Sequence, residues 1–317
     1  MSRTVSGLVI FDTSGKRCDN AEEFLSRMWA LATFCGARIL DYSLMSNHFH
    51  LVFEVPEPRP LSIDEILERI AALNPEEAQA LRVQQARLAE QPDGLEQFDR
   101  LLDKYRRRMN NLSIFVKEFK GDYAQWYNRK YNRYGALWSE RFKSVLLEAG
   151  RAVAMVIVYI SLNAVRAGLC EDPKDYRHCG YAAAVAKGTP EALAGIRIAL
   201  GLPPETSVEE LAREYRKLLF TRGALGSKNK APAFDLAKAQ EVVEQEKGEL
   251  SVQEQLRCKI RYFTNGVILG SRSFVEDYCQ RLKQKPGYKR KSGPTLCKLL
   301  GPATLWVFRN LRVRVFG

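Results

Sequence analysis

The chain has 317 residues, enough for two domains of ordinary size, and its 46% hydrophobic and 27% charged residues are typical of a globular protein. No apolar run has the length of a membrane span, and no secretory signal opens the sequence, so we expect no membrane partner. The seven cysteines are an odd number without a CxxC pair, which favours free thiols in the cytoplasm over disulfides or structural zinc.

The formal net charge of +12 is concentrated at one end of the chain. Residues 251–317 contain 14 Lys and Arg against 3 acidic residues, so the first 250 residues are close to neutral. A segment this basic favours a polyanion, most commonly nucleic acid. The alternative is a solvated tail, but the Leu, Phe, Val and Trp content is too high for a disordered segment.

The first elements in chain order predict a strand, a helix and two strands. Ser6–Phe11 is expected to be a short strand. Asn20 and Glu23 resemble a capping box, and apolar residues at helical spacing follow as far as Gly36, which predicts an amphipathic helix with a glycine stop. Arg38–Ser43 is then expected to form the second strand.

The next stretch, Leu44–Val55, contains two of the three histidines of the chain, and a tight connection through Met45 to Asn47 is expected to lead into the strand that carries them. Alternate side chains of a strand share a face, so His48 and His50 point the same way and both imidazoles can reach one metal ion. A bare His-x-His pair is a weak motif. The alternative is that both histidines lie on the wet face of a half-buried strand whose other face carries Phe49, Leu51 and Phe53.

Residues 61–108 change character after a proline-containing stretch. They are rich in charged, helix-forming residues and are divided by Pro75 and Pro92, which predicts surface helical hairpins. We interpret residues 57–110 as a helical insertion; a dimerisation arm or a clamp are the alternatives.

Aromatic residues at helical spacing from Leu112 to Trp126 predict a further helix with an aromatic core face. The loop Asn128–Gly135 follows, and in it cations alternate with aromatic rings. Binding of single-stranded nucleic acid requires cations that contact the phosphates and aromatic rings on which the bases stack. A basic surface loop without such a function fits the sequence equally well. The residues are Arg129, Lys130 and Arg133, with Tyr127, Tyr131 and Tyr134.

Phe142–Glu148 is expected to be a strand, and the stretch from Gly150 to Gly168 a helix bounded by glycines. Its buried stripe should consist of Val153, Ile157, Ile160 and Ala164. Tyr159, Asn163 and Arg166 lie beside that stripe at positions i, i+4 and i+7. A phenol and a carboxamide on one edge of a buried helix are well placed to face a site, although Tyr159 alone is also compatible with a packed core tyrosine.

The C-terminal part predicts a further domain. Helices are expected at Pro190–Leu200 and Val208–Leu219, and a linker at Ser227–Pro232. Two helices, Val252–Phe263 and Arg272–Leu282, flank a glycine-bounded turn and resemble a helix-turn-helix, with a trihelical interaction module as the alternative. The basic run Arg281–Lys291 follows. The chain is expected to end in a strand or ribbon at Leu305–Phe316, which carries Arg309, Arg312 and Arg314.

Three ordered motifs carry a resemblance to a known family. The motifs are MSNHFHLVFEVP, LWSERFKSVLLE, and VYISLNAVRAGL with DPKDYRHCGYAA. They are similar to motifs of the single-tyrosine HUH-nuclease transposases, in particular the REP-associated tyrosine transposases of the IS200-like group. The similarity runs from about Ser2 to Ala184, and RYFTNGVILGSRSF is also similar to a stretch of longer members.

The resemblance implies an α+β fold, with an antiparallel sheet that carries the histidine pair in its middle, helices on one face, and a ferredoxin-like core. It implies residues 1–186 as the nuclease domain and 187–317 as a basic, mainly helical DNA-binding domain. It assigns Tyr159 as nucleophile and His48, His50 and Asn163 as ligands of a divalent metal. Two imidazoles and an amide oxygen suit Mg²⁺ or Mn²⁺, and ligand type alone leaves zinc open.

The implied activity is the cutting and rejoining of single-stranded hairpin or palindromic-repeat DNA through a 5′-phosphotyrosine. The protein would be a monomer or homodimer, and either a transposase or a domesticated relative. A nucleic-acid-binding regulator that does not use the chemistry, and a metal-dependent phosphodiesterase in which Tyr159 is only structural, are the alternatives. The expected DNA-binding residues are Arg129, Lys130, Arg133, Arg141, Arg166, Lys289, Arg290 and Lys291.

Two departures from the family pattern bear on these expectations. Asn163 is followed by Ala164 where the family usually has proline, which a helix tolerates well. Family members also usually carry a Tyr-His strand just before the Ser-Arg that stands here at Ser2 and Arg3. A trimmed first strand or a misplaced start would affect the stability of the fold rather than its chemistry.

Overall fold

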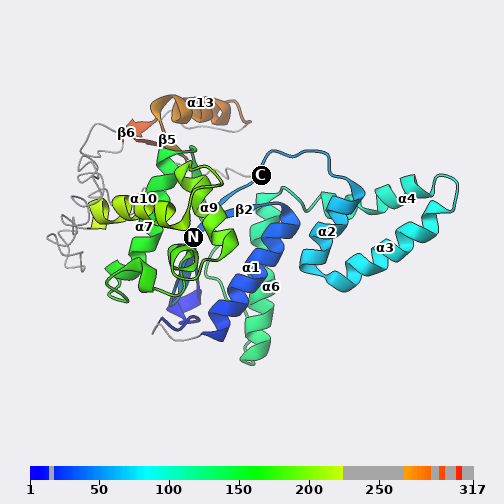
Figure 1. Cartoon of the computed structure of the whole chain (residues 1–317), viewed down its shortest axis with the longest axis horizontal. Helices are drawn as coiled ribbons and strands as arrows, with labels where there is room; N and C mark the ends of the chain where they lie inside the picture. Colours follow the sequence, from blue (N-terminus) through cyan, green and yellow to red (C-terminus); the bar gives the residue numbers. More distant parts are fainter. Residues whose placement is uncertain (14–17, 224–267, 287–292, 297–304, 309–317) are drawn as a thin grey trace. The chain divides into compact units, whose positions relative to one another are not determined.

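The computed structural model describes residues 1–13, 18–223, 268–286, 293–296 and 305–308. The described residues are mixed α and β and divide into two compact units. Unit 1 contains residues 1–13 and 40–52 and the described part of 139–308, and unit 2 contains residues 18–39 and 53–138. Figure 1 shows the elements of each unit along the chain. Among the described helices, none has both the length and the apolar character needed to cross a membrane.

The histidine strand lies in the middle of a three-stranded sheet with the order β1-β3-β2. The strands are β1 (Ser2–Arg3), β2 (Arg38–Met45) and β3 (His48–Glu54), and β1 pairs antiparallel with β3. Ser46 and Asn47 alone connect β2 to β3, and so short a connection joins antiparallel neighbours. The predicted central position of the histidine pair is therefore confirmed.

The predicted strand at Ser6–Phe11 is wrong. Ser6 and Gly7 have φ angles of 48° and 71°, which an extended strand does not permit, and Val5–Gly7 forms a short 3-10 helix, η1. The amides of Ile10 and Phe11 instead donate to the carbonyl of Ser46 in the hairpin turn. The edge strand beside β3 is formed by Ser2 and Arg3.

Helix α7 (Arg151–Arg166) is the central helix of unit 1, and Gly150 and Gly168 flank it as predicted. Most of its residues are buried, including the predicted stripe. The short elements η2 (Pro173–Asp175) and α8 (Gly180–Val185) follow, and then α9 (Pro190–Leu200) and α10 (Val208–Gly223). Helices α9 and α10 pack against α7 and α8, so contacts cross residue 186; an independent domain at 187–317 stays a prediction.

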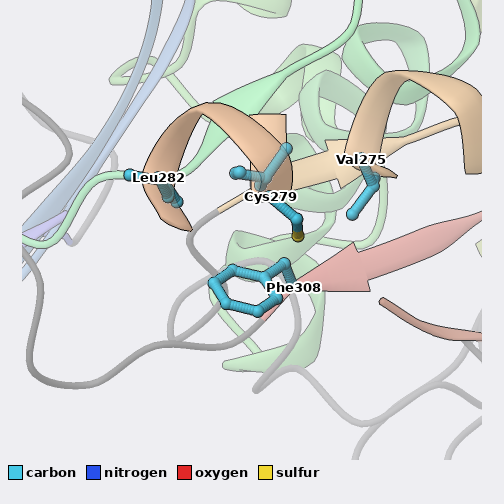
Figure 2. Packing of buried hydrophobic residues seen from close by; sticks show 5 residues of the cluster. Val275, Cys279, Leu282 and Phe308 are labelled. Atoms are coloured by element: carbon cyan, nitrogen blue, oxygen red, sulfur yellow. The ribbon is translucent and has the colours of Figure 1, made fainter. Parts of the chain in front are cut away.

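A second sheet in unit 1 has the strand order β4-β5-β7-β6. Its strands are β4 (Leu146–Leu147), β5 (Ile268–Gly270), β6 (Thr295–Leu296) and β7 (Trp306–Phe308). Helix α13 (Arg272–Lys283) packs its apolar side on this sheet, and Figure 2 shows Cys279 of the helix directed toward Phe308. Glu148 fastens the start of α13, because its carboxylate accepts hydrogen bonds from the backbone amide (2.5 Å) and hydroxyl (2.8 Å) of Ser271.

This arrangement corrects two predictions, and others lie outside the described residues. Within the expected turn of the helix-turn-helix, Ile268–Gly270 forms strand β5, which pairs with β4 and β7, and the second helix is present as α13. The strand expected at Phe142–Glu148 is limited to Leu146–Leu147. The Val252–Phe263 helix, the Ser227–Pro232 linker and Arg309, Arg312 and Arg314 lie outside the described residues.

Unit 2 is helical, as predicted. Helix α1 (Asp19–Cys35) ends at Gly36 in the left-handed conformation, although its start at Cys18 lacks the expected capping box. The insertion forms α2 (Ile63–Leu73), α3 (Pro75–Ala89), α4 (Gly94–Leu101) and α5 (Asp103–Arg106). The aromatic helix α6 (Leu112–Lys130) packs against α1, where Phe24 meets Phe119 and Tyr123 edge-on.

Candidate functional site

The two histidines of β3 share one face of the strand. The centroids of the His48 and His50 rings are 5.2 Å apart and the rings are nearly perpendicular. His50 is buried, with 7% of its surface exposed, while His48 is partly exposed and lies opposite Arg3 in the β1–β3 ladder. The alternation predicted from the sequence therefore brings both imidazoles to one place.

Asn47 orients the first of these imidazoles. Its side-chain amide nitrogen donates to the carbonyl of Gly7 (3.4 Å), which turns its oxygen toward Nδ1 of His48 at 2.8 Å. An amide oxygen only accepts, so Nδ1 carries the proton and Nε2 keeps its lone pair. This is the arrangement in which a second group fixes the tautomer of a histidine ligand.

Both imidazoles are held neutral near pH 7. Burial lowers the pKa of His48 to about 4, and the positive charges of Arg3 and the α-amino group act in the same direction. Burial lowers the pKa of His50 well below its ordinary value as well. A neutral imidazole is the form that binds a metal ion.

Helix α7 brings Tyr159 to the same place. The ring of Tyr159 meets the ring of His50 edge-on, with centroids 6.2 Å apart, and 4% of its surface is exposed. The guanidinium of Arg166 lies 5.0 Å from the centre of the Tyr159 ring and donates to its backbone carbonyl at 3.3 Å. Burial raises the pKa of the Tyr159 phenol, while the charges of Arg166 and Arg3 oppose that shift.

Asn163 lies one turn after Tyr159 on the same helix. Its side-chain amide nitrogen is buried and makes no hydrogen bond among the described residues. An orphaned buried amide costs about 1–3 kcal/mol, so such groups normally have a partner, or serve a function that supplies one.

These residues fit a divalent ion. The histidine pair offers two neutral nitrogen ligands on one face, and the carboxamide oxygen of Asn163, one turn after Tyr159 on α7, is the atom that would serve as the third ligand. Within the described part of the chain, no three His, Cys, Asp or Glu side chains form a metal-binding group, so a closed zinc cage does not occur there. A site made of two histidines and one asparagine contains only two residues of these four types, so it is compatible with this finding.

The basic and aromatic residues near the end of α6 form a separate candidate interface in unit 2. Lys130 lies 5.0 Å from the Trp126 ring and donates to Asn20, and Arg133 donates to the side chain of Asn128. The amide of Asn128 in turn donates to the carbonyl of Gly135 at 2.9 Å and closes the loop. Tyr134 is left 89% exposed at its tip.

The other predicted DNA-binding residues lie in four different places. Arg129 is exposed on α6 in unit 2, Arg141 is exposed in unit 1, and Arg166 lies against Tyr159. Lys289, Arg290 and Lys291 lie outside the described residues.

The sequence alone missed two contributors to this site. Asn47 orients His48, and Arg3 stands opposite His48 in the β1–β3 ladder. The Asn-His adjacency offered a signal for Asn47, whereas the pairing of Arg3 depended on an edge strand of two residues.

Comparisons with protein-family models, curated proteins and solved structures found no match for this chain.

Proposed function

We propose that this chain is a metal-dependent single-strand DNA endonuclease and strand transferase of the HUH type, with Tyr159 as its nucleophile. The observation that carries the proposal is the convergence of Tyr159 on the histidine pair: its ring meets His50, His50 meets His48, and Asn163 follows one turn later. A phenol beside two neutral imidazoles, with a carboxamide one turn further along the same helix, suits phosphoryl transfer better than any other chemistry at this position.

In the proposed reaction, the phenolic oxygen of Tyr159 attacks the phosphorus of a single-stranded phosphodiester. The new bond is a 5′-phosphotyrosine, the bond to the 3′ oxygen breaks, and that oxygen leaves as a hydroxyl while the phenol loses its proton. His48, His50 and Asn163 would hold Mg²⁺ or Mn²⁺, which supplies charge stabilisation at the phosphate. The covalent bond preserves the energy of the diester, so religation needs no nucleotide cofactor.

The side chains around the phenol act on its proton and on the phosphate. Arg166, against the ring, and Arg3, across the ladder from His48, both favour the phenolate over the phenol. Both are also cations close enough to act on the charge of the phenol, so they would favour an anionic phosphate there as well. They therefore counter the burial that otherwise makes the phenol a weak nucleophile.

The burial of Tyr159 favours a second candidate function. With 4% of its surface exposed, the phenol meets a DNA strand only after a local rearrangement. A nucleic-acid-binding regulator with this fold would keep the tyrosine as a packed core residue. A phosphodiesterase that does not use Tyr159 would cut DNA without forming an adduct.

The deciding experiment is incubation of the protein with labelled single-stranded hairpin oligonucleotides and Mn²⁺, followed by a denaturing gel. A DNA–protein adduct supports the proposed nuclease. Cutting without an adduct supports the phosphodiesterase, and binding without cutting supports the regulator.

We expect His48→Ala and His50→Ala each to abolish Mn²⁺ binding and cleavage while the fold survives, because a site of two histidines and an amide is open and is no structural cage. Isothermal titration with Mn²⁺ measures the effect. His178→Ala is the matched control, since the third histidine is also buried and contacts Tyr176 elsewhere in unit 1. Equal Mn²⁺ affinity in the wild type and all three variants would exclude the site.

We also expect Tyr134→Ala to weaken binding of single-stranded DNA by about 1–3 kcal/mol, the usual value of one base stacked on an aromatic ring. The loop should remain intact, because Asn128 closes it without the exposed ring of Tyr134. Tyr134→Phe is the control that keeps the stacking plane. Fluorescence anisotropy with an unstructured oligonucleotide distinguishes the two, and equal losses in both variants would contradict a stacking role.

A further inference from the structure

A buried polar cluster in unit 1 joins three elements and takes no part in the proposed reaction. Asp41 of β2, Ser161 of α7 and Tyr215 of α10 are at most 2% exposed. The Asp41 carboxylate accepts from the Tyr215 hydroxyl at 3.1 Å and from the Ser161 hydroxyl at 3.3 Å, and the two hydroxyls are 2.8 Å apart. Each of the three side chains is therefore in contact with the other two.

The surroundings of this cluster leave it little freedom. The amide of Tyr42 donates to the second carboxylate oxygen of Asp41 at 2.8 Å. A Cβ added at Gly180 would lie 2.2 Å from that same oxygen, so only glycine fits there. The ring of Tyr181 stacks on the ring of Tyr215 with centroids 4.4 Å apart. A site so closed admits no substrate, so its role is structural or positional.

The position of Ser161 on α7 connects the cluster to the candidate site. Ser161 is two residues from both Tyr159 and Asn163, and two residues correspond to about 200° around a helix. Its hydroxyl is therefore fixed on one side of α7 while Tyr159 meets His50 on another. A rotation or shift of α7 along its axis breaks the hydrogen bonds of Ser161 and displaces Tyr159 and Asn163 together.

We propose that Asp41, Ser161 and Tyr215 are positioning residues that fix the rotation of α7, so that Tyr159 and Asn163 face the histidine pair. The proposal rests on the proposed function for its catalytic consequence, but not for its structural one. It gives α10 an indirect role at the site, because Tyr215 reaches the cluster from a helix that begins more than 40 residues after the end of α7.

The test compares two buried, stacked tyrosines, of which only Tyr215 bonds to Asp41 and Ser161. Tyr215→Phe removes the hydroxyl bonded to Asp41 and Ser161 and keeps the stacked ring. Tyr181→Phe removes the hydroxyl of its stacking partner, which takes no part in the hydrogen bonds among Asp41, Ser161 and Tyr215. We expect the backbone amides of residues 159–163 to exchange with solvent about 10-fold faster in Tyr215→Phe than in Tyr181→Phe, relative to the amides of α9. Ser161→Ala should behave like Tyr215→Phe.

Adduct formation on the hairpin is the second readout. Tyr215→Phe and Ser161→Ala should slow it about 10-fold with unchanged hairpin affinity, and Tyr181→Phe should not. Equal exchange of the α7 amides in all variants, or an increase that extends equally to α9, would overturn the positioning role. A wild-type protein that forms no adduct would refute the proposed function instead, and the exchange measurement would still decide the inference.

Discussion

Tyr159→Phe is expected to reduce the DNA–protein adduct to below detection while binding of the hairpin stays nearly unchanged. The substitution keeps the ring that meets His50 and contacts Arg166, and removes only the oxygen that forms the covalent bond. The loss of one buried hydroxyl should lower the free energy of unfolding by no more than about 1 kcal/mol. A denaturing gel measures the adduct, and anisotropy measures the binding.

Tyr176→Phe is the matched control for this prediction. Tyr176 is also buried in unit 1, and its hydroxyl donates to the carbonyl of Leu44 at 2.5 Å. This variant should form the adduct at the wild-type level. An adduct that persists in Tyr159→Phe would identify another nucleophile, with Tyr176 and Tyr127 as the first to test.

The second large effect concerns stability and pH. Burial raises the pKa of Asp41 to about 7 from the ordinary 3.8, although hydrogen bonds from Tyr42, Tyr215, Ser161 and Gly180 oppose the shift. The folded state therefore keeps a proton on Asp41 between about pH 4 and pH 7, where the unfolded state has lost it. The folded state binds more protons in that window, so the contribution of Asp41 to stability falls as pH rises through it.

Asp41→Asn removes this titration and keeps the shape of the side chain. Its amide group can donate to the hydroxyls of Ser161 and Tyr215, which both accept. We expect the variant to equal the wild type at pH 4 and to exceed it at pH 8 by up to about 4 kcal/mol in free energy of unfolding. The titratable groups that face Asp41 are Tyr42, Cys179 and Tyr215, and burial raises the pKa of each, so they stay neutral across this range.

Urea unfolding of both proteins at several pH values between 4 and 8 measures this difference. Subtracting the two curves cancels the titration of every other group. A difference that does not change with pH would show that Asp41 titrates normally in the folded protein.

The features that the sequence predicted well are those with a local period. Alternation placed His48 and His50 on one face, and helical spacing placed Tyr159 one turn before Asn163; both arrangements are present in the structure. Such patterns depend only on neighbours within one or two turns, so tertiary contacts had little to change.

The failures concern residues whose structure depends on distant partners. Ser6–Phe11 has the composition of a strand, but its amides bond to a turn about 35 residues later. Ile268–Gly270 is a short apolar stretch between helical patterns, and only its pairing with β4 and β7 makes it a strand. Asp41 in a strand and Tyr215 in a helix carry no local sign that their side chains meet.

The interleaved order of unit 1 has a consequence for how the protein is made. Its sheet begins with β1, its histidines lie near residue 50, its tyrosine helix begins at residue 151, and Tyr215 bonds to Asp41 across 174 positions. Contacts between residues so far apart form slowly, because the entropy of closing the intervening loop opposes them. During synthesis, unit 2 can complete its helices first. The strands of unit 1 can pack against α7 and α10 only after these helices have left the ribosome. The nascent chain therefore acquires a complete site only after about two thirds of it has been translated.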